Sequence, residues 1–84
     1  MTLEELVTIG DKLEVQVLIS RNIYGKYTVC FERTYLPDDD IFLRGIYGTG
    51  NTIAEAVEDY HRQFAGNVMV IDKGNTKQEV IFEV

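Results

Sequence analysis

The chain has 84 residues, enough for one small domain and too few for two separate hydrophobic cores. Hydrophobic residues make up 45% of it and charged residues 26%, a balance that excludes an intrinsically disordered chain. Fourteen acidic residues against eight basic ones give a formal net charge of −6. A negative field repels nucleic acids and anionic membranes and favours basic partners, although solubility alone would also explain it.

The sequence shows no export or membrane signal. It contains no apolar run of about twenty residues, and its first residues do not form a signal peptide. Cys30 is the only cysteine, which excludes an internal disulfide and fits a reducing compartment. We therefore expect a cytoplasmic protein that forms a single domain over residues 1–84.

The first half is predicted to contain a helix followed by two strands. Thr2 and Glu5 form a capping box, and Gly10 is expected to end the helix in a left-handed conformation. Apolar residues alternate over 13–19 and again over 27–32, which predicts two strands that pair antiparallel.

The middle of the chain is predicted to contain a loop and a third strand. Pro37 and the acidic run Asp38, Asp39 and Asp40 break the alternating pattern and indicate the loop. The segment 41–47 is then predicted to form a strand, which Gly48 and Gly50 would end.

A second helix follows the glycine turn. Thr52 and Glu55 form a second capping box. The apolar residues of this helix recur at helical spacing and predict one buried stripe. They are Ile53, Val57, Tyr60 and Phe64.

The last part of the chain is predicted to form a hairpin from 68–71 and 80–84. The complete order is then α-β-β-β-α-β-β, an α+β fold in which an antiparallel sheet carries two helices on one face. Because the final strand is apolar, its edge is a candidate for pairing with a second copy or with a partner strand, and we expect a homodimer.

The glycine turn resembles that of the double-stranded-RNA-binding domain, which has a Gly-x-Gly-x-Ser/Thr entry to its last helix. Gly48, Gly50 and Thr52 match this pattern. The family places lysines just after the entry to contact phosphates, whereas this chain has Ile53 and Ala54 there. No lysine or arginine lies between residues 44 and 62, so we expect no direct nucleic-acid binding.

The chain is also similar to HicB-type antitoxins, whose β-β-β-α-β unit carries a Gly-x-Thr-x-x-Glu-Ala signature. Gly50, Thr52, Glu55 and Ala56 match it in type and spacing. The resemblance implies an antitoxin module that neutralises a small RNA-cleaving toxin, although the N-terminal helix and the lack of an appended DNA-binding segment depart from the family. In size and charge the chain looks like small phage-type inhibitors such as anti-CRISPR proteins.

Acidic side chains are the first candidates for partner contact. They are Glu55, Glu58 and Asp59 on the second helix, with Asp38, Asp39 and Asp40 in the loop. Together they could imitate a run of phosphates on a basic partner. Alternatively, the loop is simply solvated, and Glu55 serves the helix dipole.

Aromatic side chains are the second candidates. Tyr24 and Tyr35 are predicted to lie in loops, where they could form a contact patch with Phe42 and Tyr47. Ordinary packing of loop ends is the alternative.

The residues give no support for catalysis or for a bound metal. Cys30 and His61 are single ligands without a paired motif, short of a zinc site within one chain. No nucleophile with a base and no nucleotide loop is present. We therefore expect a non-enzymatic inhibitor without cofactor or metal, which binds a basic nucleic-acid-processing protein such as a CRISPR nuclease. The alternative is the antitoxin.

Overall fold

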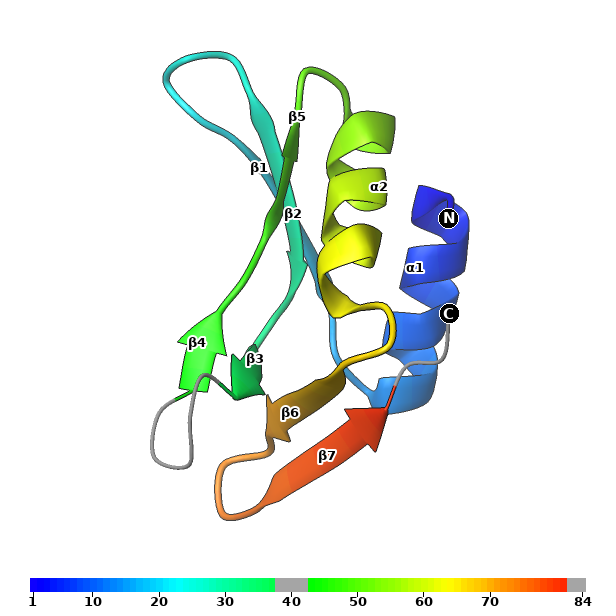
Figure 1. Cartoon of the computed structure of the whole chain (residues 1–84), viewed down its shortest axis with the longest axis vertical. Helices are drawn as coiled ribbons and strands as arrows, with labels where there is room; N and C mark the ends of the chain where they lie inside the picture. The colour runs from blue at the N-terminus through cyan, green and yellow to red at the C-terminus, as the bar shows by residue number, and fades with distance from the viewer. Residues whose placement is uncertain (38–42, 82–84) are drawn as a thin grey trace.

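The computed structural model describes residues 1–37 and 43–81 and shows an α+β domain, as predicted. Within these residues, two helices and seven strands follow one another (Figure 1). They are α1 (Leu3–Leu13), β1 (Val17–Arg21), β2 (Tyr27–Phe31), β3 (Thr34–Pro37), β4 (Leu43–Gly45), β5 (Gly48–Gly50), α2 (Ile53–Phe64), β6 (Val68–Asp72) and β7 (Lys77–Ile81).

The strands form two antiparallel sheets. One sheet has the order β1-β2-β5, and the other has the order β4-β3-β6-β7. Both helices lie on the same side of the three-stranded sheet, and α2 is the helix next to it (Figure 1).

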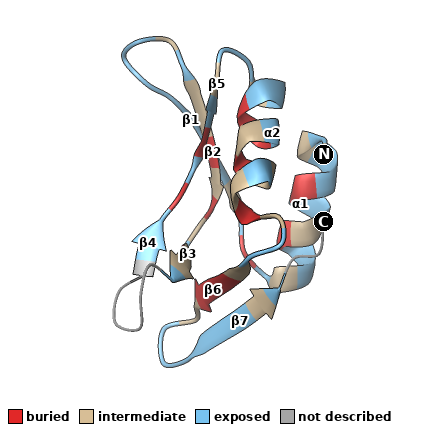
Figure 2. Ribbon diagram, viewed as in Figure 1, coloured by how far each residue is buried: buried red, intermediate tan, exposed pale blue. Residues whose placement is uncertain are grey.

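The core lies between α2 and the strands that it covers (Figure 2). Val57, Tyr60 and Phe64 of the predicted stripe are almost fully buried, and the rings of Tyr60 and Phe64 meet edge to face with centroids 5.0 Å apart. Phe31 of β2 contacts both rings. The apolar spacing of the second helix therefore identified its buried face correctly.

The predicted end of the first helix is wrong. Thr2 and Glu5 form the expected capping box, but α1 continues beyond Gly10 to Leu13. Glu14, with φ of 60°, takes the left-handed position instead. Gly10 serves close packing, because a Cβ there would lie 2.8 Å from the carbonyl oxygen of Val15.

The predicted third strand is also wrong in its extent. It is replaced by β4 and β5, which belong to different sheets and are separated by buried Ile46. Gly48 and Gly50 form β5 rather than ending a strand, and Thr34–Pro37, expected to be irregular, forms β3. The final strand begins at Lys77, three residues earlier than predicted, and its predicted last residues 82–84 lie outside the described residues.

Candidate functional site

The Gly-Thr-Gly segment brings the backbone of β5 against the backbone of α2. A Cβ added at Gly48 would lie 2.0 Å from the carbonyl oxygen of Ala56 and 2.5 Å from the amide nitrogen of Tyr60. A Cβ at Gly50 would lie 2.5 Å from Cβ of Glu55. All three distances are shorter than real contacts allow, so only glycine fits at either position. The two glycines therefore serve helix–strand packing, whereas the sequence predicted a turn that ends a strand.

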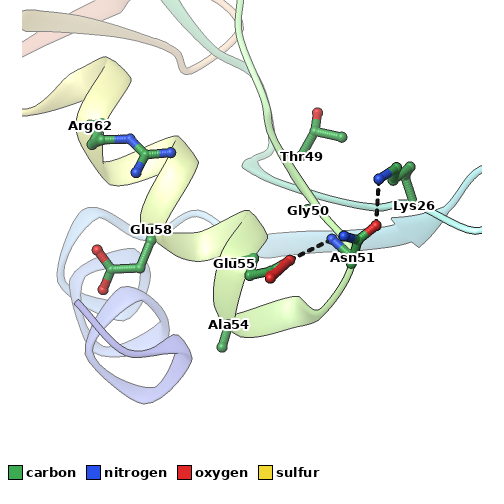
Figure 3. Close-up of a pocket in the computed structure, with 8 residues that line it drawn as sticks. All are labelled: Lys26, Thr49, Gly50, Asn51, Ala54, Glu55, Glu58 and Arg62. Carbon is green, nitrogen blue, oxygen red and sulfur yellow. Dashed lines mark hydrogen bonds between the residues drawn. The ribbon is translucent and has the colours of Figure 1, made fainter.

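The start of α2 is fixed by side chains of the motif itself. Thr52 is the N-cap, and its hydroxyl accepts a hydrogen bond from the N–H of Glu55 at 3.1 Å. The carboxylate of Glu55 accepts from the N–H of Asn51 at 2.8 Å and not from that of Thr52, so the predicted second capping box is only half formed (Figure 3). Every residue shared with the antitoxin signature thus has a local structural role, since Ala56 is fully buried.

Asp59 holds β5 to α2. Its carboxylate accepts hydrogen bonds from the N–H of Thr49 at 2.9 Å and from the side chains of Arg62 and Gln63 at 3.2 Å each. The bond from Thr49 is the main cause that lowers the pKa of Asp59 below its ordinary value of 3.8. Asp59 is a predicted partner contact. In the structure its carboxylate is hydrogen-bonded within the protein, and 32% of its side chain is exposed.

Glu58 joins the two helices. Its carboxylate lies 2.6 Å from the amino group of Met1, and this hydrogen bond is the main cause that lowers the pKa of Glu58. The same bond raises the pKa of the amino group. The side chain of Glu58 is still 52% exposed, so it remains accessible to a partner.

The two helices run in the same direction, and the start of α1 lies beside α2, where the amino group of Met1 bonds to Glu58 (Figure 1). Glu4 and Glu5 lie in the first turn of α1, and Glu55 lies in the first turn of α2. Together with Glu58 they are exposed, and we call these four residues the helix-end acidic surface. Of the predicted acids, Glu55 and Glu58 belong to this surface. Asp38, Asp39 and Asp40 lie outside the described residues.

An open groove of about 490 Å³ lies beside this surface, between α2, β5 and the start of β2 (Figure 3). Its lining residues are Lys26, Thr49, Gly50, Asn51, Ala54, Glu55, Glu58 and Arg62. Two cationic side chains, Lys26 and Arg62, therefore line the groove, and the sequence did not predict either of them there.

The side chain of Lys26 donates a hydrogen bond to the side chain of Asn51 in the glycine turn. The two residues lie 25 positions apart and are brought together because Tyr27 pairs with Gly50. Nothing in the local sequence around the turn indicates Lys26, so only the pairing of β2 with β5 would have predicted it. Arg62 faces the groove from α2 and forms an ion pair with Asp59 at 3.2 Å.

The predicted aromatic residues do not share one surface. Tyr24 is 82% exposed in the turn between β1 and β2. Tyr35 is predicted to lie in a loop, but the structure places it in β3, where it pairs with Val70 of β6 and Gly45 of β4. Its side chain is half-buried. The β1–β2 turn lies at the top of the molecule and β3 in its lower half, so the two are well separated (Figure 1). Phe42 lies outside the described residues.

Cys30 and His61 have separate surroundings. Partial burial raises the pKa of the Cys30 thiol, and the ring of His61 packs edge to face on Phe64, with centroids 5.4 Å apart. Within residues 1–37 and 43–81, no three histidine, cysteine or acidic side chains are grouped so as to hold a metal ion. In the same residues, no helix has the length and apolar character needed to cross a membrane.

No protein-family model, curated protein sequence or solved structure matches the chain. The resemblances to HicB-type antitoxins and to double-stranded-RNA-binding domains therefore depend on the motif residues alone and stay predictions.

Proposed function

We propose that the chain is a non-catalytic inhibitor that binds a basic nucleic-acid-processing protein, most concretely an anti-CRISPR protein that blocks a CRISPR nuclease. The observation that supports this proposal best is the helix-end acidic surface, where Glu4, Glu5, Glu55 and Glu58 lie exposed in the first two turns of two parallel helices. Such a surface would occupy a site that otherwise holds phosphates. Charge-driven binding of this kind is fast and weakens as salt is added.

The two cations of the groove offset this surface only in part. Arg62 is paired with Asp59, although its charge also lowers the pKa of Glu58. Lys26 donates to the neutral side chain of Asn51 and keeps its positive charge. The hydrogen bonds of Glu55 and Glu58 to described residues use Oε2 and Oε1, respectively. Each of these carboxylates therefore keeps its other oxygen for a cation on a partner.

The proposal is tested with two variants that each remove three negative charges. The surface variant carries Glu4→Gln, Glu55→Gln and Glu58→Gln. The control variant carries Asp11→Asn, Glu14→Gln and Glu79→Gln. Glutamine retains an acceptor oxygen at the positions of Glu55 and Glu58, so the surface variant is expected to fold like the wild type and to melt slightly lower, because the ion pair between Glu58 and Met1 is lost. Asp59 is left unchanged, because a charge reversal there would remove the acceptor of the Thr49 N–H.

Tagged wild type and both variants are used to capture proteins from a bacterial lysate supplemented with CRISPR effector nucleases. We expect wild type and control to capture one basic nuclease at low salt, and the surface variant to bind it at least about tenfold more weakly. Equal capture by all three proteins would contradict the proposal. Recovery of a small toxin instead would favour the HicB-type antitoxin, and a mobility shift of duplex RNA would favour the RNA-binding domain.

A further inference from the structure

Strand β1 forms an open edge of the three-stranded sheet. Within the described residues it has a strand neighbour, β2, on one side only. The N–H of Glu32 donates to the carbonyl of Gln16, and the N–H of Asn22 donates to the carbonyl of Lys26. Even-numbered residues of β1 therefore direct their backbone groups toward β2. By the alternation of an antiparallel ladder, Val17, Ile19 and Arg21 direct their N–H and C=O groups to the open edge.

This edge carries little of the protection that natural edges have against association. Natural edges are kept short or carry charged residues or proline. The edge strands β4 and β5 have three residues each, and β7 exposes Lys77 and Glu79. Like β7, β1 has five residues, but its one charged residue is Arg21 at its end, and it begins Val-Leu-Ile, with Leu18 47% and Ile19 42% exposed.

We propose that β1 pairs antiparallel with β1 of a second copy of this chain, around a two-fold axis at Ile19. In this register Ile19 lies opposite Ile19 of the second copy, and Val17 lies opposite Arg21, so all five residues overlap. The three residues that face the open edge then satisfy their N–H and C=O groups in both copies. The two sheets join into one continuous six-stranded sheet with the order β5-β2-β1-β1-β2-β5.

A second copy of β1 fits this edge because the open N–H and C=O groups of Val17, Ile19 and Arg21 are arranged symmetrically about Ile19. Such an interface is isologous, because the same strand contributes from both sides. Repulsion between two copies of net charge −6 is weak at this strand, because residues 15–23 contain no acidic side chain. The two copies of Arg21 lie four strand positions apart, about 13 Å, which exceeds the screening length at physiological salt of about 8 Å.

The exposed tip of the β1–β2 hairpin supports the same arrangement. Ile23 is 92% exposed and Tyr24 is 82% exposed, an unusual exposure for two adjacent large side chains. In the antiparallel dimer the tip extends along the second copy to the level of its residues 14–15, where α1 gives way to β1. The dimer therefore brings these apolar side chains against a protein surface. The proposal also moves the predicted homodimer contact from the C-terminal strand to β1.

The test compares two variants that each replace an exposed isoleucine with lysine on an edge strand. Ile19→Lys places two like charges across the proposed axis, whereas Ile81→Lys makes the same change on β7, where the isoleucine is 70% exposed. Sedimentation of the full chain is measured from micromolar to near-millimolar concentration. We expect a wild-type dimer that Ile81→Lys leaves unchanged and that Ile19→Lys weakens at least about tenfold.

Amide hydrogen exchange on the wild type provides a measurement that does not depend on any variant folding. The amides of Val17, Ile19 and Arg21 are expected to exchange more slowly as concentration rises, while those of β7 stay unchanged. The proposal is overturned if the wild type is monomeric throughout, if Ile81→Lys disrupts the dimer as strongly as Ile19→Lys, or if these three amides show no dependence on concentration.

Discussion

Replacing Gly48 with alanine is expected to destabilise the domain strongly, because no space exists for a methyl group between β5 and α2. The added Cβ would lie 2.0 Å from the carbonyl oxygen of Ala56 and 2.6 Å from Cβ of Tyr60. The first of these atoms and the nearby amide nitrogen of Tyr60 belong to the backbone, so a side-chain rotation cannot relieve the overlap. The helix must instead move away from the strand.

The magnitude follows from the cost of overpacking a core. Inserting a methyl group into a filled core typically costs 1–3 kcal/mol, and a clash with backbone on the far side lies at or above the upper end, about 3 kcal/mol or more. For a domain of this size that loss corresponds to a melting temperature lowered by about 12 °C or more. It is a large share of the roughly 5–15 kcal/mol that stabilises ordinary domains.

Urea denaturation of Gly48→Ala and Gly45→Ala measures this effect against a matched control. Gly45 lies in the same segment, but a Cβ there would meet only the ring of Tyr35 at 3.9 Å, an ordinary contact. We expect Gly45→Ala to change the free energy of unfolding by at most about 1 kcal/mol. If Gly48→Ala is as stable as Gly45→Ala, the helix does not approach the strand backbone as described.

Three further predictions concern single side chains. The hydroxyl of Tyr60 accepts a hydrogen bond from the buried N–H of Phe31 at 3.1 Å, so Tyr60→Phe should cost about 1–3 kcal/mol and speed exchange of that amide. Tyr27→Phe, at a half-buried position, is the control and should cost less; equal losses would contradict this role. The pKa of Asp59 is lowered in the fold, so its stabilising effect is complete above its ordinary value of 3.8 and is lost as pH falls. The stability difference between wild type and Asp59→Asn should therefore shrink as the pH falls below 3.8, and a difference independent of pH would refute the assignment. Because burial raises the pKa of Cys30, alkylation of its thiol at neutral pH should be slower than that of a free cysteine peptide, and an equal rate would be contrary evidence.

The sequence predicted most accurately those parts of the fold that depend on local physics. The caps at Thr2 and Thr52 and the buried stripe from Val57 to Phe64 follow from hydrogen-bonding side chains and helical periodicity, and the structure confirms them. These features depend on residues within a few positions of one another, which a single sequence displays directly.

The features that the sequence did not predict depend on contacts between distant residues. The segment around Ile46 reads as one strand, but its two ends pair with different sheets, which no local pattern shows. Likewise Gly48 and Gly50 resemble a turn, because their need for close approach arises only when α2 packs on β5. Lys26 joins the groove only through strand pairing.

The candidate acids show the same division. Helical spacing correctly placed Glu58 on the exposed side of the second helix, where it stays accessible. It could not distinguish Asp59, one residue later, whose carboxylate turns toward the N–H of Thr49. The contribution of α1 to the acidic surface depends on the parallel arrangement of the two helices, which is likewise a tertiary feature (Figure 1).

The proposal that the helix-end acidic surface binds a basic partner is tested most directly by the affinity for the captured nuclease as a function of salt. Wild type, surface variant and control variant are compared over a series of salt concentrations. The account predicts that wild type and control bind tightly at low salt, weaken steeply as salt rises, and converge on the surface variant at high salt. Affinities that are the same for all three proteins and insensitive to salt would contradict it.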